Sequence, residues 1–289
     1  MSPRRLFAAL AFLATSLVLV APSSPAQAAT KDPVIVVPGF TTGPIVSVGY
    51  LPLVERLRNA GYDVTLLVYP DYGLGDINAN AQRLANTVAS VRARTGAAKV
   101  DLVAHSMGGL VSRTFVKNLG GSTKVDSLIT MGTPHYGTDL AVIAKFLTFG
   151  SCVGITACNQ MARGSSFLAS LNAGDDTIGS VRYTAIATKV DEIVFPYSTA
   201  FLANDGNIRN VAVQDQCWAR LPGHLGLILD GTTFDGVNDA LKGNTVSMNC
   251  WAMSCPAFMN GDPEPKNASL LFDPCCVMGV SLIGGGLEL

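Results

Sequence analysis

Residues 99–118, KVDLVAHSMGGLVSRTFVKN, constrain the fold more than any other part of the chain. An apolar run over 100–104 leads directly into a small turn centred on Ser106, and a helical pattern over 110–118 follows. A serine at the tightest point of a strand–helix turn is typical of a nucleophile held on a sharp corner. The alternative is an ordinary connection that needs small residues. The pattern here is A-H-S-M-G, in which Ala104 replaces the first glycine of the usual G-x-S-x-G elbow.

Short apolar runs alternate with helical patterns along most of the chain. The expected strands are 34–37, 64–69, 100–104, 125–131, 182–188 and 208–213, and the expected helices include 51–60, 77–95 and 235–242. Short β-branched runs separated by amphipathic helices are typical of a parallel sheet covered on both faces. The sequence therefore predicts an α/β fold with a mostly parallel six-stranded sheet.

The first 28 residues have the features of a secretory signal peptide. Two arginines precede an apolar run over 6–20, and Ala26-Gln27-Ala28 forms a small-x-small cleavage site. The competing interpretation is a membrane anchor, but a spanning helix needs about 20 apolar residues. We therefore expect an extracellular protein whose mature chain begins near Ala29.

Two later segments depart from the alternation. Residues 137–172 contain no clear strand but many apolar side chains, which fits either ordinary helix packing or an apolar wall over a binding cleft. Residues 244–289 form a cysteine-rich extension to which we assign no fold or role. The expected main domain is 29–243.

Seven cysteines in an exported chain predict disulfides. Cys152 and Cys158 are the expected local pair. The others, an odd number, leave one thiol free or paired between chains: Cys217, Cys250, Cys255, Cys275 and Cys276. Their spacing does not fit a zinc ribbon, so we expect no metal or other cofactor.

Charge excludes one class of partner. Charged residues make up 14% of the chain, against a usual ~25%, and the formal net charge is −1. Without a basic patch we expect no nucleic-acid partner. A surface of low charge fits contact with lipid, although a deeply buried sheet gives the same composition. We expect a monomer.

A serine nucleophile needs a base, and the chain has three histidines. His105 lies within the elbow, where its ring does not easily return to the neighbouring serine. His135 follows the fourth strand, near the rim of the expected cleft. His224 follows the last strand on a glycine-rich loop, at the sheet edge where catalytic groups gather, and is the favoured base.

The base needs an acidic partner, which in the order Ser…Asp…His lies between 106 and 224. Asp191 follows the strand 182–188 within TKVDEIV (188–194) and is the favoured acid. Asp205 and Asp215 are alternatives. Glu192 is next to Asp191 and could be mistaken for the acid. Asp175-Asp176 precede the strand 182–188 and so lie at its other end.

The oxyanion formed during acyl transfer needs two N–H donors. Met107, one residue past the serine, provides the first. The second is expected from the loop after the first strand, and Phe40 is preferred with Thr41 in reserve.

Five stretches resemble, in the same order, the small secreted bacterial triacylglycerol lipases of lipase class 2. They are DPVIVVPGF (32–40), KVDLVAHSMGG (99–109), VDEIV (190–194), NIRNV (207–211) and GHLGL (223–227). The resemblance implies a minimal α/β-hydrolase fold, no metal and carboxylic-ester hydrolysis. It puts nucleophile, acid and base on Ser106, Asp191 and His224.

Two features depart from the family pattern. Pro38-Gly39 stands where members often have His-Gly, and the cysteine-rich extension is additional. The expected function is that of a secreted serine hydrolase acting on esters, with acylglycerols as the expected substrates. The alternatives are an acyltransferase or polyester depolymerase using the same residues, and a non-catalytic binding protein on a hydrolase scaffold.

Overall fold

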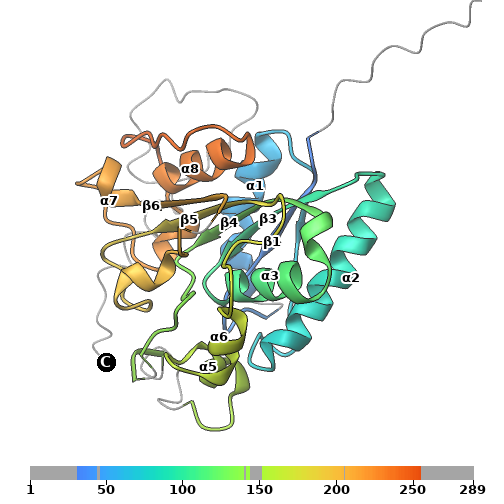
Figure 1. Ribbon diagram of the computed structural model, residues 1–289. Helices are drawn as coiled ribbons and strands as arrows, with labels where there is room; N and C mark the ends of the chain where they lie inside the picture. Colours follow the sequence, from blue (N-terminus) through green and yellow to red (C-terminus); the bar gives the residue numbers. More distant parts are fainter. Residues whose placement is uncertain (1–30, 44–45, 140, 144–151, 205, 255–289) are drawn as a thin grey trace, which may run out of the picture. The chain divides into compact units, whose positions relative to one another are not determined.

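The computed structural model describes residues 31–254, apart from 44–45, 140, 144–151 and 205 (Figure 1). The expected signal peptide and residues 255–289, with Cys255, Cys275 and Cys276, lie outside the described residues. Asp205, one of the alternative acids, also lies outside them.

The described residues form a six-stranded sheet in the order β2-β1-β3-β4-β5-β6, in which every pair of neighbouring strands is parallel. The strands are β1 (Val34–Val37), β2 (Val64–Leu66), β3 (Val100–His105), β4 (Val125–Met131), β5 (Arg182–Ala187) and β6 (Ile208–Ala212). The predicted α/β fold class is confirmed. β2 ends earlier than predicted because β1, the neighbour it pairs with, ends at Val37.

Helices cover both faces of the sheet (Figure 1). They are α1 (Leu51–Asn59), α2 (Ile77–Thr95), α3 (Met107–Asn118), α5 (Thr156–Met161), α6 (Ser166–Leu171), α7 (Val213–Gln216) and α8 (Gly231–Leu241). Short 3-10 turns span Val46–Tyr50, Gly121–Thr123, Tyr197–Ala200 and Leu225–Ile228. No helix among the described residues is long and apolar enough to cross a membrane.

Two hydrophobic cores lie on opposite faces of the sheet. One packs α2 and α3 against it, through side chains that include Leu84, Val88 and Phe115. The other packs α1 and α8, through Leu57 and Val237 among others. Successive strand residues point to opposite faces, so Ile35 joins the first core and Val36 the second.

Caps define the start of the longest helix on each face, α2 on one and α8 on the other. Asp76 accepts a hydrogen bond from the Asn78 N–H at the start of α2, and Gly96 ends it with φ 72°. α8 begins four residues before the predicted 235, because the Asp230 carboxylate accepts from the Thr233 N–H at 2.8 Å. An aspartate that binds the N3 amide is a common helix start.

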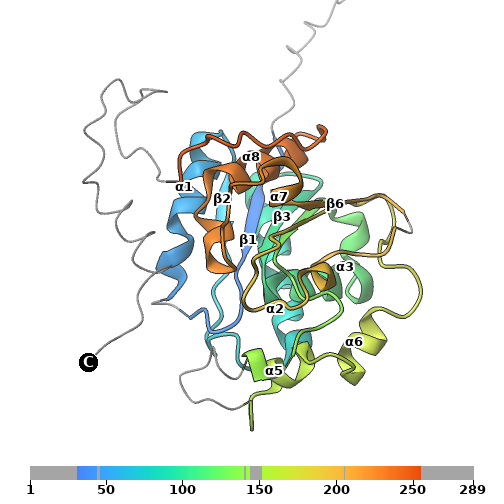
Figure 2. The same ribbon diagram turned by 90° about the vertical axis from the view of Figure 1, so that its left-hand side faces the viewer.

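The described part of 137–172 packs as helices rather than strands. α5 and α6 lie side by side below α2 and α3 (Figure 2), and Met161, Leu168 and Leu171 are buried in the same core as those helices. Cys152 and Cys158 are paired, as predicted. These buried side chains fit ordinary helix packing, and a role as an apolar wall over a cleft stays a prediction. Residues 144–151 lie outside the described residues.

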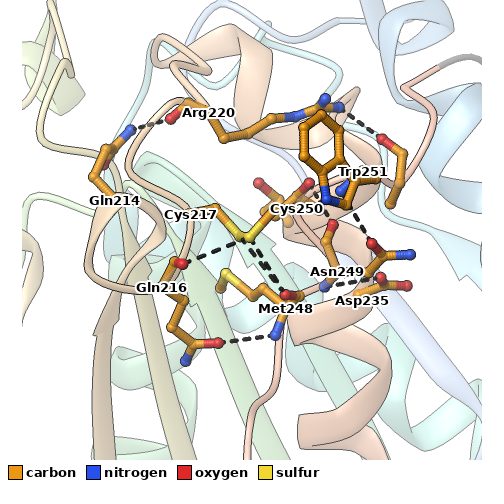
Figure 3. The surroundings of a disulfide bond; sticks show 12 residues. Gln214, Gln216, Cys217, Arg220, Asp235, Met248, Asn249, Cys250 and Trp251 are labelled. Atoms are coloured by element: carbon orange, nitrogen blue, oxygen red, sulfur yellow. Dashed lines mark hydrogen bonds between the residues drawn. A yellow bond between two sulfur atoms is a disulfide. The ribbon is translucent and has the colours of Figure 1, made fainter.

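Residues 244–254, placed in the extension from the sequence, run along α8, whose side chains form hydrogen bonds with the backbone of Ser247 and Asn249. Val246 and Met248 are buried in the same core as α8. Cys250 is bonded to Cys217, and Gln216 holds Met248 by a hydrogen bond from the Met248 N–H (Figure 3). The pairing of Cys217 with Cys250 was left open by the sequence.

Candidate active site

Ser106 occupies a strained turn between β3 and α3. Its φ of 55° and ψ of −131° are far outside the regions that side chains with a Cβ prefer. A Cβ on Gly108 would lie 2.2 Å from the Val37 carbonyl oxygen, and one on Gly109 would lie 2.1 Å from Thr133 Oγ1. The small residues are therefore required by close packing around the turn. Strain of this kind is concentrated at functional sites.

His224 and Asp191 meet on two neighbouring loops at the carboxyl edge of the sheet. His224 Nδ1 lies 3.0 Å from both carboxylate oxygens of Asp191. The Asp191 Oδ1 atom also accepts hydrogen bonds from the N–H groups of Ile193 (2.9 Å) and Val194 (2.7 Å). These donors hold the carboxylate in place, and the carboxylate keeps the imidazole proton on Nδ1. The Nε2 atom is thereby left as the proton acceptor.

The end of β4 connects this pair to the elbow. The Ser106 N–H donates to the Met131 carbonyl at 2.9 Å. The next residue, Gly132, has φ 54°, and a Cβ there would lie 3.1 Å from Asp191 Oδ2 and 3.2 Å from His224 Nδ1. The backbone that fixes the serine thus also supports the acid and the imidazole. All three side chains are buried, with exposures of 7% for Ser106, 7% for Asp191 and 2% for His224.

The turn after β1 lies beside Ser106. A Cβ on Gly39 would lie 2.9 Å from the serine Cβ, so this position excludes larger residues. The Gly39 N–H donates to the Tyr50 hydroxyl, whereas no acceptor for the Phe40 N–H is found in the part of the chain that the structure describes. Thr41 has a φ of 62°, a second strained position next to the elbow. Met107 is the first residue of α3, where an N–H has no partner within the helix.

Glu192 and His105 both contact the backbone of His224, which the sequence did not indicate. The Glu192 Oε2 atom accepts from the backbone N–H of His224 at 2.8 Å, so it supports the loop rather than the ring. His105 Nε2 lies 3.0 Å from the His224 carbonyl oxygen, and the two rings are 4.8 Å apart. A motif search cannot find either contact, because both depend on how distant loops meet.

The remaining candidates lie in other contacts. His135 is fully buried, with its Nε2 atom 3.1 Å from Thr130 Oγ1, and burial lowers its pKa well below the usual value. Asp215 pairs with Lys189 at 2.5 Å. Asp176 pairs with Arg113 at 2.7 Å. A hollow of about 280 Å³ is lined by residues that include Asn78, Gln160 and Phe167, none of them on the loops with Ser106, Asp191 or His224.

Comparison with known proteins gives one family match and several relatives. Residues 39–153 match a family described as a domain of unknown function (DUF7379). Over 194 residues the chain is 28% identical to lipase B of Pseudozyma antarctica, covering 63% of this chain and 54% of that protein. Over 118 residues it is 36% identical to a triacylglycerol lipase of Pseudarthrobacter phenanthrenivorans, covering 39% of this chain and 36% of that protein. The aligned part is thus about half the length of these relatives or less.

The fold is shared with a solved structure. The crystal structure of Aspergillus fumigatus lipase B superposes with a TM-score of 0.64 at 24% sequence identity, covering 73% of this chain and 52% of that one. Together with the parallel sheet and the strained serine turn, this likeness defines the architecture. The protein therefore has the α/β-hydrolase fold, and the curated proteins that it matches in sequence include lipases.

Proposed function

We propose that the protein is a serine hydrolase that cleaves carboxylic esters through an acyl-enzyme on Ser106. The observation that carries the proposal is the hydrogen bond from His224 Nδ1 to the buried Asp191 carboxylate, on loops beside the elbow. A carboxylate that fixes the tautomer leaves Nε2 free to take the serine proton. The names of the sequence relatives, lipase and triacylglycerol lipase, support the same chemistry.

The reaction proceeds in two halves. Ser106 Oγ attacks the ester carbonyl while His224 takes its proton, and Asp191 stabilises the imidazolium that forms. The N–H groups of Phe40 and Met107 donate to the oxyanion. The tetrahedral intermediate expels the alcohol, which leaves with the proton from His224. Water activated by His224 then attacks the acyl-enzyme and releases the carboxylic acid.

Exposed apolar side chains on the loops of Asp191 and His224 support a substrate with an apolar acyl chain, of the acylglycerol class. Val190 precedes the acid, and Leu221 and Leu225 flank His224; all three are exposed. Phe195, four residues past the acid, is 63% exposed. Exposed apolar side chains on the loops that carry Asp191 and His224 favour contact with apolar ligands or lipid surfaces. Hydrolysis rates for p-nitrophenyl esters of increasing chain length, dissolved and emulsified, test this substrate class.

A fluorophosphonate probe tests the nucleophile. We expect the probe to modify Ser106, as located by peptide mass spectrometry, and Ser106→Ala to abolish both labelling and ester hydrolysis. Ser112→Ala is the matched control, because Ser112 is a buried serine of the same helix whose hydroxyl donates to the Gly108 carbonyl. Full hydrolysis by the Ser106→Ala protein would reject the proposal.

Secretion is part of the same proposal. Two disulfides, Cys152–Cys158 and Cys217–Cys250, fit an oxidising compartment. Expression in a secreting host followed by N-terminal sequencing of the protein from the medium tests it. We expect a chain that begins near Ala29, and a chain retained in cells with residues 1–28 intact would contradict the proposal.

A further inference from the structure

A chain of three buried hydrogen bonds connects the turn after β1 to the backbone of His224. The Gly39 N–H donates to the Tyr50 hydroxyl at 2.8 Å. The same hydroxyl lies 2.7 Å from His105 Nδ1, and His105 Nε2 lies 3.0 Å from the His224 carbonyl oxygen. We name the two side chains in the middle, Tyr50 and His105, the Tyr50–His105 bridge.

The direction of each hydrogen bond follows from the two ends. The His224 carbonyl oxygen only accepts, so the His105 proton lies on Nε2. Burial lowers the pKa of His105 well below its usual value, and His224 lowers it further, so the ring is neutral and Nδ1 accepts. Tyr50 therefore donates to Nδ1 and accepts from Gly39. Burial also raises the pKa of Tyr50, which keeps its hydroxyl protonated.

We propose that Tyr50 and His105 are positioning residues that set the oxyanion turn and the backbone of the base relative to each other. The inference rests on the proposed function, since it assigns a role in that reaction. One end of the bridge holds Gly39, directly before the proposed donor Phe40. The other end holds the carbonyl of His224, while Glu192 holds the N–H of the same residue at 2.8 Å. Both peptide groups of the base are thereby held by side chains, the carbonyl by the buried His105 and the N–H by the more exposed Glu192.

Charge gives a further reason for a neutral ring at position 105. The rings of His105 and His224 are 4.8 Å apart, and His224 becomes an imidazolium during the proposed reaction. A second cation at that distance would oppose its formation. His105 therefore provides a hydrogen bond without adding a charge, which neither lysine nor arginine could do. A leucine would fill the space but would leave the Tyr50 hydroxyl without its acceptor.

Variants separate positioning from simple core packing. Tyr50→Phe removes the hydroxyl but keeps the ring, and His105→Leu removes both nitrogens. We expect each to lower kcat about 10- to 100-fold with KM within about twofold, because small displacements of catalytic groups cost up to ~10²-fold. His105→Gln keeps an N–H₂ group able to reach the His224 carbonyl and is expected to recover part of kcat. Tyr62→Phe is the matched control, since Tyr62 is buried in the same core but contacts Lys31 instead.

A second measurement does not depend on activity. Nitrogen-15 NMR of the three imidazoles reports tautomer and titration directly. We expect His105 to be the Nε2–H tautomer and to remain neutral at pH values at which an ordinary imidazole is protonated. An Nδ1–H tautomer, titration near pH 6.5, or kcat losses no larger than that of Tyr62→Phe would each overturn the bridge and leave the proposed ester hydrolysis intact. Failure of the proposed function is recognised separately, by full activity of Ser106→Ala, and the positioning role would be rejected with it.

Discussion

The guanidinium of Arg113 forms a buried ion pair with the Asp176 carboxylate, with an Nη2–Oδ1 distance of 2.7 Å. Arg113 is on α3, the helix that begins after Ser106, and Asp176 precedes β5, the strand that leads to Asp191. The second Asp176 oxygen accepts from the Ala203 N–H at 2.8 Å and from the Tyr136 hydroxyl at 2.5 Å. The pair thus ties the helix behind the elbow to the loops beside β5.

We expect Asp176→Asn to destabilise the fold strongly. The substitution leaves the guanidinium buried and unpaired, and breaking a buried pair from one side costs about 3–5 kcal/mol. For a chain of this size the midpoint of thermal unfolding should fall by about 10 °C or more. Asp63→Asn is the control, because Asp63 pairs with Arg94 on the surface. Equal melting temperatures for the two variants would contradict a structural role for the buried pair.

Asp191→Asn should remove activity without unfolding the protein. The asparagine Oδ1 can still accept from Ile193 and Val194, so its N–H₂ group would face His224 Nδ1. That contact places the imidazole proton on Nε2, where it can no longer accept the serine proton. In serine hydrolases the same change lowers kcat about 10⁴-fold. Circular dichroism melting with ester hydrolysis checks both parts, and Asp215→Asn, at a surface pair, should retain activity.

Asp101, at the amino end of β3, should make the protein less stable at higher pH. Its carboxyl is buried, which is the main cause of a pKa raised from 3.8 to about 7, and the nearby Asp32 and Asp126 carboxyls raise it further. The folded state therefore holds more protons than the unfolded state between about pH 4 and pH 7. The free energy of unfolding falls as pH rises through this range, because the charged form is disfavoured in the fold.

Asp101→Asn should reverse this loss. Its Oδ1 can accept the Ser127 N–H that the carboxylate now accepts at 2.9 Å, and the amide stays neutral. We expect the variant to unfold several degrees above the wild type at pH 8, and the difference to shrink at pH 5. Each unit by which folding raises the pKa of Asp101 corresponds to about 1.4 kcal/mol of lost stability when the carboxyl is charged. A difference that is the same at both pH values would show that the charge of Asp101 is not its cause.

Hydrophobic periodicity was enough to predict the sheet. The strands 34–37 and 125–131 and the helix 77–95 have the predicted bounds, because each is a continuous apolar or amphipathic run bounded by turn residues. The ends that differ depend on contacts. β2 stops where its neighbour stops, and α8 starts at the Asp230 cap. That cap, an aspartate three residues before Thr233, was a signal that the sequence did contain.

The site was predictable to the extent that its residues follow strands. Asp191 and His224 were chosen for that reason, and the structure brings their side chains together. Glu192 and His105 were considered only as possible acid and base, whereas they hold the backbone of His224. Such contacts depend on the relative position of loops more than 30 residues apart, which no local pattern encodes. Spacing predicted the local pair Cys152–Cys158, whereas the number of cysteines did not identify the partner of Cys217.

The Cys217–Cys250 disulfide should make a large contribution to stability, because it connects the end of α7 to residues 244–254. It closes a loop with a sequence separation of 33, and removing a native disulfide typically costs about 2–5 kcal/mol. The Cys217→Ala/Cys250→Ala double variant avoids an unpaired thiol at either position. We expect its unfolding midpoint in urea to fall and Val246 and Met248 to become accessible to hydrogen exchange at their amides.

Cys152→Ala/Cys158→Ala is the matched control, because that bond closes a separation of only 6 and so restricts the unfolded chain less. If the two double variants lost equal stability, loop length would not explain the role of the longer disulfide. If the wild-type protein kept its unfolding midpoint in reducing buffer, with Cys217 and Cys250 shown to be reduced by thiol labelling, the bond would not be what holds residues 244–254 against α8.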